Sequence, residues 1–590
     1  MPNNISRRHF LKKAGAVSLL SVSVGGCAQS MLNSFDKSID SKPNVIFILT
    51  DDQGYGDLAC HGHPTLKTPN IDKLYAECTR FTDFHVAPQC IPTRGELMTG
   101  THCLRNGTGY LLPGLSEIRP QIPTIGEMFK AGGYTTGQFG KWHLGDNHPY
   151  RPQDRGFDET VHHASWGIAS LMDYWDNDYF DDTYEHNGTL EKYNGYCTDV
   201  FFNEAMKWMT KQQEKGKPFF CYIPVNVPHG PLLVAEKYER MYEEEGAFLG
   251  MITQFDENMG RMEQFLNKTG LKENTIFIYM TDNGSCCGTE VYNAGMRGGK
   301  NSYYDGGHRV PFFFRWPAAG INKPRDIDEL AQGMDLVPTL LDLCNIERPA
   351  GVKFDGISLA GLISGKETKL ADRKIVIQIY DFKDPGTVMW NKWRLVNGDE
   401  LYNITEDAGQ RRNIIDKHPD IAKELREYHA RWTERMSSFE GLKSVINIGV
   451  DTEPTTFLCS AHWFVTHGGQ WGVDEWEQVG MPGVKNGYWL LHVEETGRYK
   501  VEAYGWPKQS GAAFGDRLQS LDEKLGGRKV SSVKLIVGAK EMTAKTSPRE
   551  TNATFTINLK KGDKPRLQTF LYDKNGKDLG GSYFVYVTKL

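Results

Sequence analysis

The chain starts its first long apolar run at Asn44 with NVIFILT and continues directly into Asp51 and Asp52. A continuous apolar run of strand length, without alternation, is typical of a strand covered on both faces, as in the parallel sheets of α/β proteins. In such sheets the ligand crevice lies outside the carboxyl ends of the strands. The run therefore predicts an α/β domain with two carboxylates at its ligand-binding edge.

A second run of the same kind ends at the same edge of the predicted sheet. Thr275–Met280 (TIFIYM) is followed, after one threonine, by Asp282 and Asn283. The two strand ends can converge, which would bring three aspartates and one asparagine together. Such an all-oxygen ligand set suits Ca²⁺ or Mg²⁺ rather than zinc. The alternative is turn chemistry, because Asp, Asn and Gly commonly end strands.

A reactive side chain is predicted in the run CIPTRGELMTG, residues 90–100. Pro92 suits the first turn of a helix, where its missing N–H is not needed. Cys90 would then lie at the positive end of that helix, where an anion is stabilised, and Arg94 would add a forked cation. The run indicates a nucleophile beside an arginine, and the alternative is an ordinary turn with a buried thiol.

Two basic side chains follow the strand-like segment 134–140. Alternation along a strand would point Lys141 and His143 to the same side. We therefore expect a cation and an acid/base group next to each other.

Two further basic residues lie in loops after apolar runs. His229 follows the run 219–227 in a turn bounded by Pro228 and Pro231, and Lys300 lies on a glycine-rich loop. A lone histidine or lysine is more often structural or solvated than catalytic. However, apolar segments followed by such polar residues recur in order along the chain, so their occurrence by chance is implausible.

In combination, residues 43–435 resemble the type I, formylglycine-dependent sulfatases of the alkaline phosphatase superfamily. The shared blocks are Cys-x-Pro-(Ser/Thr)-Arg with Leu-x-Thr-Gly, Gly-Lys-Trp-His-Leu-Gly, Pro-His-x-Pro, and Gly-x-Lys followed by Gly-Gly-x-Arg-Val-Pro. The sequence departs from the usual pattern with Thr93 in place of the commoner serine and Asp305 in place of glutamate.

This resemblance implies two cofactors and one partner. A maturation enzyme would oxidise Cys90 to formylglycine, whose hydrate supplies the attacking hydroxyl. One Ca²⁺ per subunit would be held by the group formed at Cys90 together with the four oxygen-bearing residues, Asp51, Asp52, Asp282 and Asn283.

The remaining residues can be assigned from the chemistry of a sulfate ester, a tetrahedral anion whose cleavage needs cations, a nucleophile and an acid. Lys141 and Lys300 would pair with the charge, and Arg94 would orient the hydrate. His229 would protonate the departing oxygen, and His143 would serve the second half-reaction.

The chain of 590 residues is long enough for more than one core, since single cores stop growing at roughly 250–300 residues. We predict a leader and linker over 1–42, and an alkaline-phosphatase-like sulfatase domain over 43–371 with a mixed, mostly parallel sheet between helices. A small α+β subdomain follows over 372–440, with a helix over 419–436. Alternating strands predict a β-sandwich over 455–590, whose aromatic residues could bind glycans or simply fill its core.

The first residues indicate export. The basic segment 6–13, with Arg7 and Arg8, precedes the modest apolar run 14–24 and resembles a bacterial twin-arginine leader. Residues 24–27 also resemble a lipoprotein box with Cys27 as the acylated residue, and simple cleavage nearby is the alternative. We expect the twin-arginine machinery to export the protein to the periplasm or, as a lipoprotein, to the outer membrane or cell surface.

The composition limits the classes of substrate that we expect. The net charge of −6 gives no basic field for nucleic acid, so local lysines would have to attract a sulfated substrate. The sequence predicts a sulfatase acting on sulfated carbohydrates, or on aryl sulfates. The alternatives are a phosphodiester or phosphonate monoester hydrolase of the same superfamily, and an inactive exported protein that binds glycans.

Overall fold

A computed structural model describes residues 41–109, 116–243, 245–380, 383–468, 476, 479, 485–521 and 523–590. These residues belong to one compact unit, Ile39–Leu590. The predicted leader, Cys27 included, lies outside the described residues apart from residues 41 and 42. No described helix combines the length and the apolar character that crossing a membrane requires.

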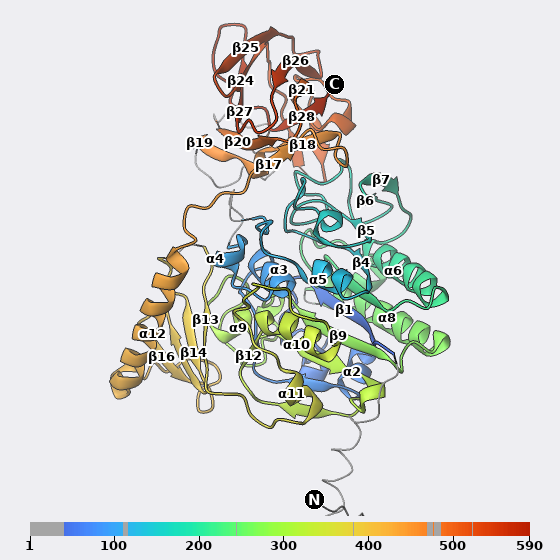
Figure 1. The fold of residues 1–590 in the computed structure, drawn as a ribbon, viewed down its shortest axis with the longest axis vertical. Helices are drawn as coiled ribbons and strands as arrows, with labels where there is room; N and C mark the ends of the chain where they lie inside the picture. Colours follow the sequence, from blue (N-terminus) through green and yellow to red (C-terminus); the bar gives the residue numbers. More distant parts are fainter. Residues whose placement is uncertain are drawn as a thin grey trace, which may run out of the picture. The chain divides into compact units, whose positions relative to one another are not determined.

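The main sheet has, within the described residues, ten strands in the order β11-β2-β10-β9-β1-β8-β4-β5-β6-β7 (Figure 1). Its centre, from β9 to β5, is parallel, whereas β10, β6 and β7 pair antiparallel with their neighbours. The predicted mixed α/β fold is therefore confirmed. The strands are β1 (Asn44–Thr50), β2 (Thr79–Phe81), β4 (Thr135–Phe139), β5 (Glu159–His162), β6 (Thr183–His186), β7 (Thr189–Lys192), β8 (Phe219–Pro224), β9 (Thr275–Thr281), β10 (Phe312–Arg315) and β11 (Arg325–Ile327).

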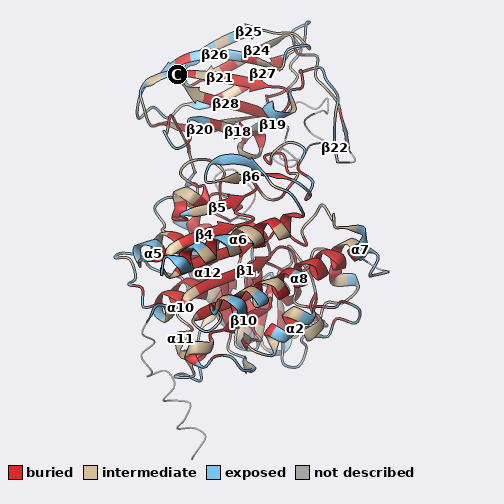
Figure 2. Cartoon of the chain, turned by 90° about the vertical axis from the view of Figure 1, so that its right-hand side faces the viewer, coloured by how far each residue is buried: buried red, intermediate tan, exposed pale blue. Residues whose placement is uncertain are grey.

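Helices cover both faces of this sheet, which explains why its central strands are apolar throughout. Ile46 and Ile48 share a core with α2 (Pro69–Tyr75), α6 (Cys197–Glu214) and α8 (Gly246–Thr269). On the other face Phe220 stacks on Phe129 of α5, with ring centroids 4.6 Å apart. Figure 2 shows these strands buried between helices whose outer sides are exposed. The helices near the second face are α3 (Cys90–Thr99), α5 (Ile125–Ala131) and α10 (Leu336–Leu343).

Shorter elements connect these layers. The helices are α4 (Cys103–Asn106), α7 (Glu236–Glu239), α9 (Asp305–His308) and α11 (Ala360–Ser364), and β3 (Phe84–His85) pairs with β12 (Ala331–Gln332). The 3₁₀ turns are Ala59–His61, Pro152–Arg155, Gly288–Glu290, Pro317–Ala319, Gly333–Asp335, Ile415–Lys417, Ser460–His462 and Lys508–Ser510.

A four-stranded antiparallel sheet and one long helix follow the main sheet. Leu425 and Trp432 of the helix are buried in the same cluster as Leu395 of the sheet, so the helix covers one face of it. The helix predicted over 419–436 is confirmed. The elements are β13 (Lys374–Ile377), β14 (Thr387–Trp390), β15 (Trp393–Val396), β16 (Glu400–Asn403) and α12 (Pro419–Ser437).

The C-terminal region consists of mostly antiparallel sheets, with one parallel strand pair, around a single core. Buried and exposed residues alternate along its strands, most regularly in β26, as expected for a sandwich. Trp463, Trp489 and Trp506 are at most 1% exposed and fill this core, so they offer no surface to a glycan. One sheet holds β17 (Ile446–Ile448), β19 (Phe464–His467), β20 (Asn486–Val493), β24 (Ser532–Val537), β25 (Lys540–Lys545) and β27 (Arg566–Tyr572), and the other holds β18 (Thr455–Cys459), β21 (Gly497–Tyr504), β26 (Asn552–Leu559) and β28 (Phe584–Lys589), with a separate pair β22 (Leu518–Ser520) and β23 (Glu523–Leu525).

The sandwich packs directly on loops of the main domain. Leu171 and Met172, from the loop after β5, belong to the sandwich core cluster. Asn147 Nδ2 donates hydrogen bonds to Glu453 Oε1 at 3.2 Å and to the Phe457 carbonyl at 2.9 Å. The two regions therefore share both apolar and polar contacts.

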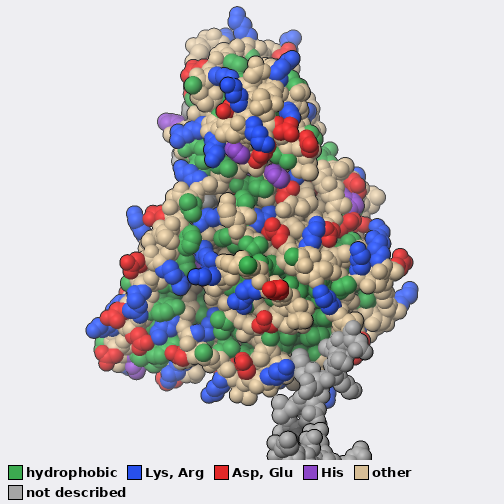
Figure 3. All heavy atoms as spheres, viewed as in Figure 1, with side chains coloured by type: hydrophobic (Ala, Val, Ile, Leu, Met, Phe, Trp, Pro, Cys, Tyr) green, Lys and Arg blue, Asp and Glu red, His purple; other side chains and the backbone are tan. Residues whose placement is uncertain are grey.

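Charged side chains of both signs are mixed over the face drawn in Figure 3. This agrees with a net charge of only −6 spread over 590 residues.

Arg394 of β15 ties the C-terminal sheet to the main domain through a buried charge cluster. Its Nη2 donates to Asp83 Oδ1 at 2.7 Å and its Nε to Asp305 Oδ1 at 3.3 Å. His85 bridges Asp83 and His308, at 2.8 and 2.9 Å. Burial alone would raise the pKa of Asp83, but Arg394 and His85 hold it well below its ordinary value. Asp305, the departure from the usual glutamate, is thus fixed by an arginine.

We expect Arg394→Met to lower the free energy of unfolding by about 3–5 kcal/mol, because two carboxylates would stay buried without their counter-ion. Chemical denaturation at pH 7 measures this, with Arg431→Met on the exposed side of α12 as the control. The stabilisation from Asp83 is present above the ordinary carboxyl pKa of about 4 and is lost as pH falls below it, so the variant should approach the wild type in acid. A pH-independent difference would contradict this account.

Candidate active site

The carboxyl ends of β1 and β9 bring four oxygen-bearing side chains together. The strands are parallel neighbours in register, so the residues that follow them lie side by side. Ligand atoms of Asp51, Asp52 and Asp282 lie within 4.8 Å of one another. Asn283 Nδ2 donates to Asp52 Oδ1 at 2.9 Å. The structure therefore confirms the prediction that the two strand ends converge.

This cluster fits a divalent cation. Asp51 Oδ1 and Asn283 Oδ1 are buried and have no hydrogen-bond partner among the described residues. Burial, and then the neighbouring Asp51, raise the pKa of Asp282 to about 7, so a bound cation would favour the ionised form of this carboxyl. Carboxylate and amide oxygens are the ligands that Ca²⁺ and Mg²⁺ prefer.

Cys90 is the first residue of α3, as its sequence predicted, and all ten residues of that helix are buried. Burial raises the pKa of the Cys90 thiol, and the nearby lysines, Lys141 and Lys300, offset this only in part. The thiolate is the nucleophilic form of cysteine. An unmodified Cys90 is therefore a poor nucleophile at neutral pH.

Arg94 faces the carboxylates from the next turn of the same helix. Its Nη2 and Nε donate to Asp282 Oδ2 at 2.8 and 3.1 Å, and Nη2 lies 3.6 Å from Asp51 Oδ1. The side chain is fully buried. These contacts fix the guanidinium between Cys90 and the acidic cluster.

Two lysines reach the same carboxylates from separate loops. Lys141 Nζ lies 2.5 Å from Asp51 Oδ2, and Lys300 Nζ lies 2.7 Å from Asp52 Oδ2. Lys141 is fully buried. Burial alone would lower the pKa of Lys300, but Asp52 raises it above its ordinary value, so this amine stays charged.

The prediction that strand alternation aligns Lys141 and His143 is wrong, although both residues do reach the site. β4 ends at Phe139, and His143 has a left-handed backbone with φ 61°. Lys141 is positioned instead by its backbone N–H, which donates to the Pro224 carbonyl at 2.6 Å. Gly140 allows this approach, because a Cβ there would lie 2.1 Å from the same oxygen.

The His143 ring is neutral and free to bond. Its side chain is buried, and neither ring nitrogen has a hydrogen-bond partner among the described residues. Burial, together with Lys141 and Arg94, lowers its pKa well below the ordinary value. A neutral imidazole can accept a proton at one nitrogen and donate at the other.

His229 approaches the same oxygen of Asp52 as Lys300 does. Its Nδ1 is 2.7 Å from the Gly230 carbonyl, which requires a proton on Nδ1 and leaves Nε2 for other partners. Nε2 is 3.5 Å from Asp52 Oδ2. Burial lowers the pKa of His229. The Trp166 ring packs beside it, with centroids 5.5 Å apart.

The sequence motifs missed residues that hold the loops in place. Gln89, the N-cap of α3, donates to Asn301 Oδ1, and the Asn301 N–H donates to the Pro88 carbonyl at 2.8 Å. The Lys300 loop is therefore attached to the residue before Cys90. Asn226 is buried with both amide atoms unpartnered among the described residues. The sequence signal that could have identified Asn226 is its position as a polar residue inside the apolar run 219–227.

The assembled site balances three carboxylates with three cations. The carboxylates are Asp51, Asp52 and Asp282, and the cations are Arg94, Lys141 and Lys300. Fixed donors of this kind can stabilise a tetrahedral anion as charge moves onto its oxygens. The predicted site residues, which are spread over 250 positions of sequence, thus meet at one point.

Residues 43–346, which contain all of these groups, match the family described as Sulfatase. The chain belongs to the sulfatase family. Residues 299–435 of this sulfatase also match the C-terminal part of N-sulphoglucosamine sulphohydrolase. Neither match extends beyond residue 435, so the sandwich lies outside both.

Curated relatives of this sulfatase are named as sulfatases. N-acetylgalactosamine-6-sulfatase of Canis lupus familiaris is 29% identical over 360 residues, covering 56% of this chain and 68% of that protein. An ulvan-active sulfatase of Formosa agariphila is 29% identical over 386 residues, covering 61% and 72%. This sulfatase is accordingly a sulfuric ester hydrolase.

Solved structures agree with the fold. Ps i-CgsB in complex with k-i-k-neocarrahexaose superposes with a TM-score of 0.62 at 26% identity, covering 68% of this chain and 95% of that one. The phosphonate monoester hydrolase of Agrobacterium radiobacter, at a TM-score of 0.52 and 18% identity over 67% of this chain and 96% of that one, shares the fold.

Proposed function

We propose that this sulfatase hydrolyses sulfate esters of carbohydrates, using a formylglycine formed at Cys90 and one Ca²⁺ ion. The observation that carries the proposal is the buried cluster of three carboxylates and three cations around Cys90 at the start of α3. Because burial keeps the Cys90 thiol protonated, a modification at this residue would supply the nucleophile that the thiol does not.

Each cofactor has a defined contribution. Asp51, Asp52, Asp282 and Asn283 would hold the ion, which when bound polarises a sulfate oxygen as a Lewis acid. Formylglycine at Cys90 would supply, as its hydrate, one hydroxyl for attack on sulfur and a second whose deprotonation would expel sulfate and restore the aldehyde. A formylglycine-generating maturation enzyme is therefore an expected partner.

The cationic side chains would bind and orient the sulfate group. Lys141 and Lys300 reach Asp51 and Asp52 from separate loops, and both amines would bind oxygens of a sulfate group held near Cys90. Arg94 is held more rigidly by its contacts to Asp282, which suits a role in orienting the group at Cys90.

The two histidines would move protons. His229 donates through Nδ1 to a carbonyl, so Nε2 is the atom able to carry a proton to the departing oxygen. A bound sulfate ester would raise the lowered pKa of His229, because a nearby negative charge favours the protonated ring. His143, with both nitrogens unpartnered among the described residues, is assigned to the second half-reaction.

Carbohydrate sulfates are favoured as substrates by the names of similar proteins. These include an N-acetylgalactosamine-6-sulfatase, an ulvan-active sulfatase and a structure with a neocarrahexaose. Export by the twin-arginine machinery to the periplasm or cell surface, with a possible lipid anchor at Cys27, is part of the proposal and is supported by the N-terminal sequence. An exported enzyme would meet such polymers outside the cytoplasm.

Mass analysis of the tryptic peptide Phe81–Arg94 tests the nucleophile. In protein from a maturation-competent host, Cys90 should have lost one sulfur and two hydrogens and gained one oxygen, and the same preparation should release sulfate from sulfated oligosaccharides. Cys90→Ala should abolish release, whereas Cys60→Ala, a free cysteine outside the site, should retain it. Full turnover by a preparation with an unmodified thiol would refute the proposed mechanism.

Thermal unfolding tests the metal. Ca²⁺ at a hundredfold excess over its dissociation constant should stabilise the chelator-treated protein by about 2.7 kcal/mol, because it binds the folded state alone. Asp282→Asn should remove most of this shift, and Asp372→Asn, outside the cluster, should leave it unchanged. An equal shift in Asp282→Asn would rule out this metal site.

Leaving-group dependence tests His229. His229→Ala should lower kcat for alkyl sulfates by roughly 10²–10⁴-fold, the usual contribution of a general acid, and should affect activated aryl sulfates much less. His467→Ala, an exposed histidine of the sandwich, is the matched control. Equal losses for both substrate types would contradict the role of general acid.

A further inference from the structure

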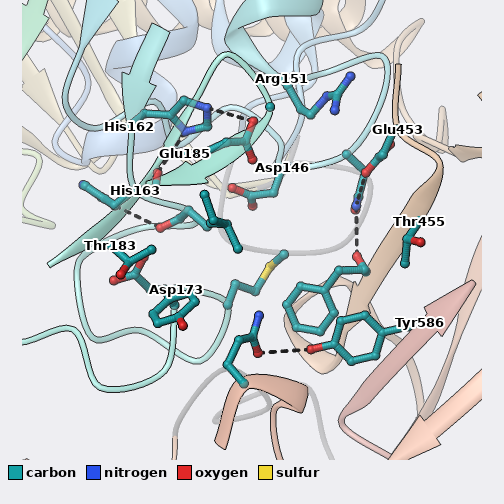
Figure 4. A pocket seen from close by; sticks show the side chains of 18 of the residues that line it. Asp146, Arg151, His162, His163, Asp173, Thr183, Glu185, Glu453, Thr455 and Tyr586 are labelled. Atoms are coloured by element: carbon teal, nitrogen blue, oxygen red, sulfur yellow. Dashed lines mark hydrogen bonds and ion pairs between the residues drawn. The ribbon is translucent and has the colours of Figure 1, made fainter. Parts of the chain in front are cut away.

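A cavity of about 330 Å³ lies where the main domain meets the sandwich. Figure 4 shows His162, His163 and Glu185 on one side of it, and Glu453 and Tyr586 on the other. Its volume is within the range of roughly 300–1,000 Å³ that is usual for ligand pockets. The family matches end at residue 435, so the sandwich wall of this cavity lies outside them.

The cavity and the active site share two stretches of backbone. Residues 141–143 reach the acidic cluster, and the same loop continues into Asp146, Asn147 and Arg151 of the cavity wall. Residues 162–164 also line the cavity, and Trp166 just beyond them packs on His229. Short stretches of chain therefore connect the cavity wall to the active site.

Two residues that line this space carry neutral, buried hydrogen-bond acceptors. His163 Nδ1 donates to the Ala164 carbonyl at 2.9 Å, which leaves Nε2 as a bare acceptor, buried and without a partner among the described residues. Burial and the charge of Lys141 lower the pKa of His163 to about 3, so its ring is uncharged. Asn147 uses its amide nitrogen on Glu453 and Phe457, and its Oδ1 is likewise unpartnered there.

The charged residues of the wall are already engaged. Arg151 pairs with Asp154 at 2.8 Å, and His162 Nε2 lies 3.5 Å from Glu185. Within the described lining, each cation thus faces a carboxylate, so the cavity offers little to a sulfate group.

The acidic residues of the wall also have partners. Asp146, Asp173 and Glu453 each accept a backbone N–H, at 2.7, 3.0 and 2.8 Å. These three are not among the residue groups close enough to hold a metal ion. The wall therefore favours an uncharged ligand with hydroxyl donors.

Aromatic surface completes the site. Phe457 and Tyr586 stack with centroids 4.8 Å apart and an angle of 15° between their planes, and both line the cavity with Tyr174. Flat aromatic faces can pack against the C–H faces of sugar rings, and the carboxylate oxygens of the wall can accept hydrogen bonds from the hydroxyls.

We propose that this cavity binds an uncharged sugar unit of the same carbohydrate whose sulfate ester occupies the active site. The sandwich then contributes to substrate selection by supplying one wall of this cavity. This inference rests on the proposed function for the identity of the substrate, but the binding of a neutral sugar can be measured without turnover.

Filling the cavity tests the proposal by kinetics. Thr455 is exposed on the cavity wall, so Thr455→Trp should occupy the sugar position without entering a packed core. It should lower kcat/KM for sulfated neocarrahexaose by about tenfold relative to 4-nitrophenyl sulfate, which carries no further sugar. Thr543→Trp, on exposed β25, should leave the ratio of the two kcat/KM values unchanged. An unchanged ratio in Thr455→Trp would overturn the proposal.

Direct binding separates this proposal from the proposed function. Saturation-transfer NMR with desulfated, uncharged neocarrahexaose should detect binding to Cys90→Ala protein, and the signal should vanish when Thr455→Trp is added but persist with Thr543→Trp. Absence of binding to Cys90→Ala, or binding unaffected by Thr455→Trp, would refute the sugar site. Retained binding together with a lack of sulfate release by wild-type protein that carries formylglycine at Cys90 would refute the proposed function alone.

Discussion

Mutual neutralisation of buried charges at the ends of β1 and β9 is the interaction on which the site depends. Three carboxylates in a water-excluded pocket would repel one another and be costly to bury without counter-ions. Arg94, Lys141 and Lys300 supply these from one helix and two loops. The acidic cluster therefore forms only when the central sheet, α3 and both loops are in place together.

Much of this arrangement was predictable because its signals are local. The runs at 44–50 and 275–281 are apolar throughout because both faces of these strands are covered, and this pattern predicted buried strands. Pro92 predicted the start of α3. The four oxygen ligands followed from the general rule on strand ends. Site residues whose position depends on a strand end or a helix start could thus be predicted from sequence.

Other features depend on contacts between distant segments and gave no local signal. His143 reaches the site because the chain leaves β4 and passes close to Pro224, not because a strand continues. The pairing of Arg394 with Asp83 joins residues 311 positions apart. Strand β25, KEMTAK, places only Met542 and Ala544 against the core and is exposed at its other positions, so its periodicity was too weak to indicate a strand.

The burial of Cys90 has a consequence for the order of events during biosynthesis. The residue is 4% exposed, and the helix that it begins is enclosed on every side. An enzyme that oxidises this cysteine has to bind the surrounding segment in an extended form, so it must act before the sheet and α3 come together. If folding were faster than this modification, a stable protein with a protonated thiol would accumulate. The active fraction of any preparation would then depend on the relative rates of modification and folding.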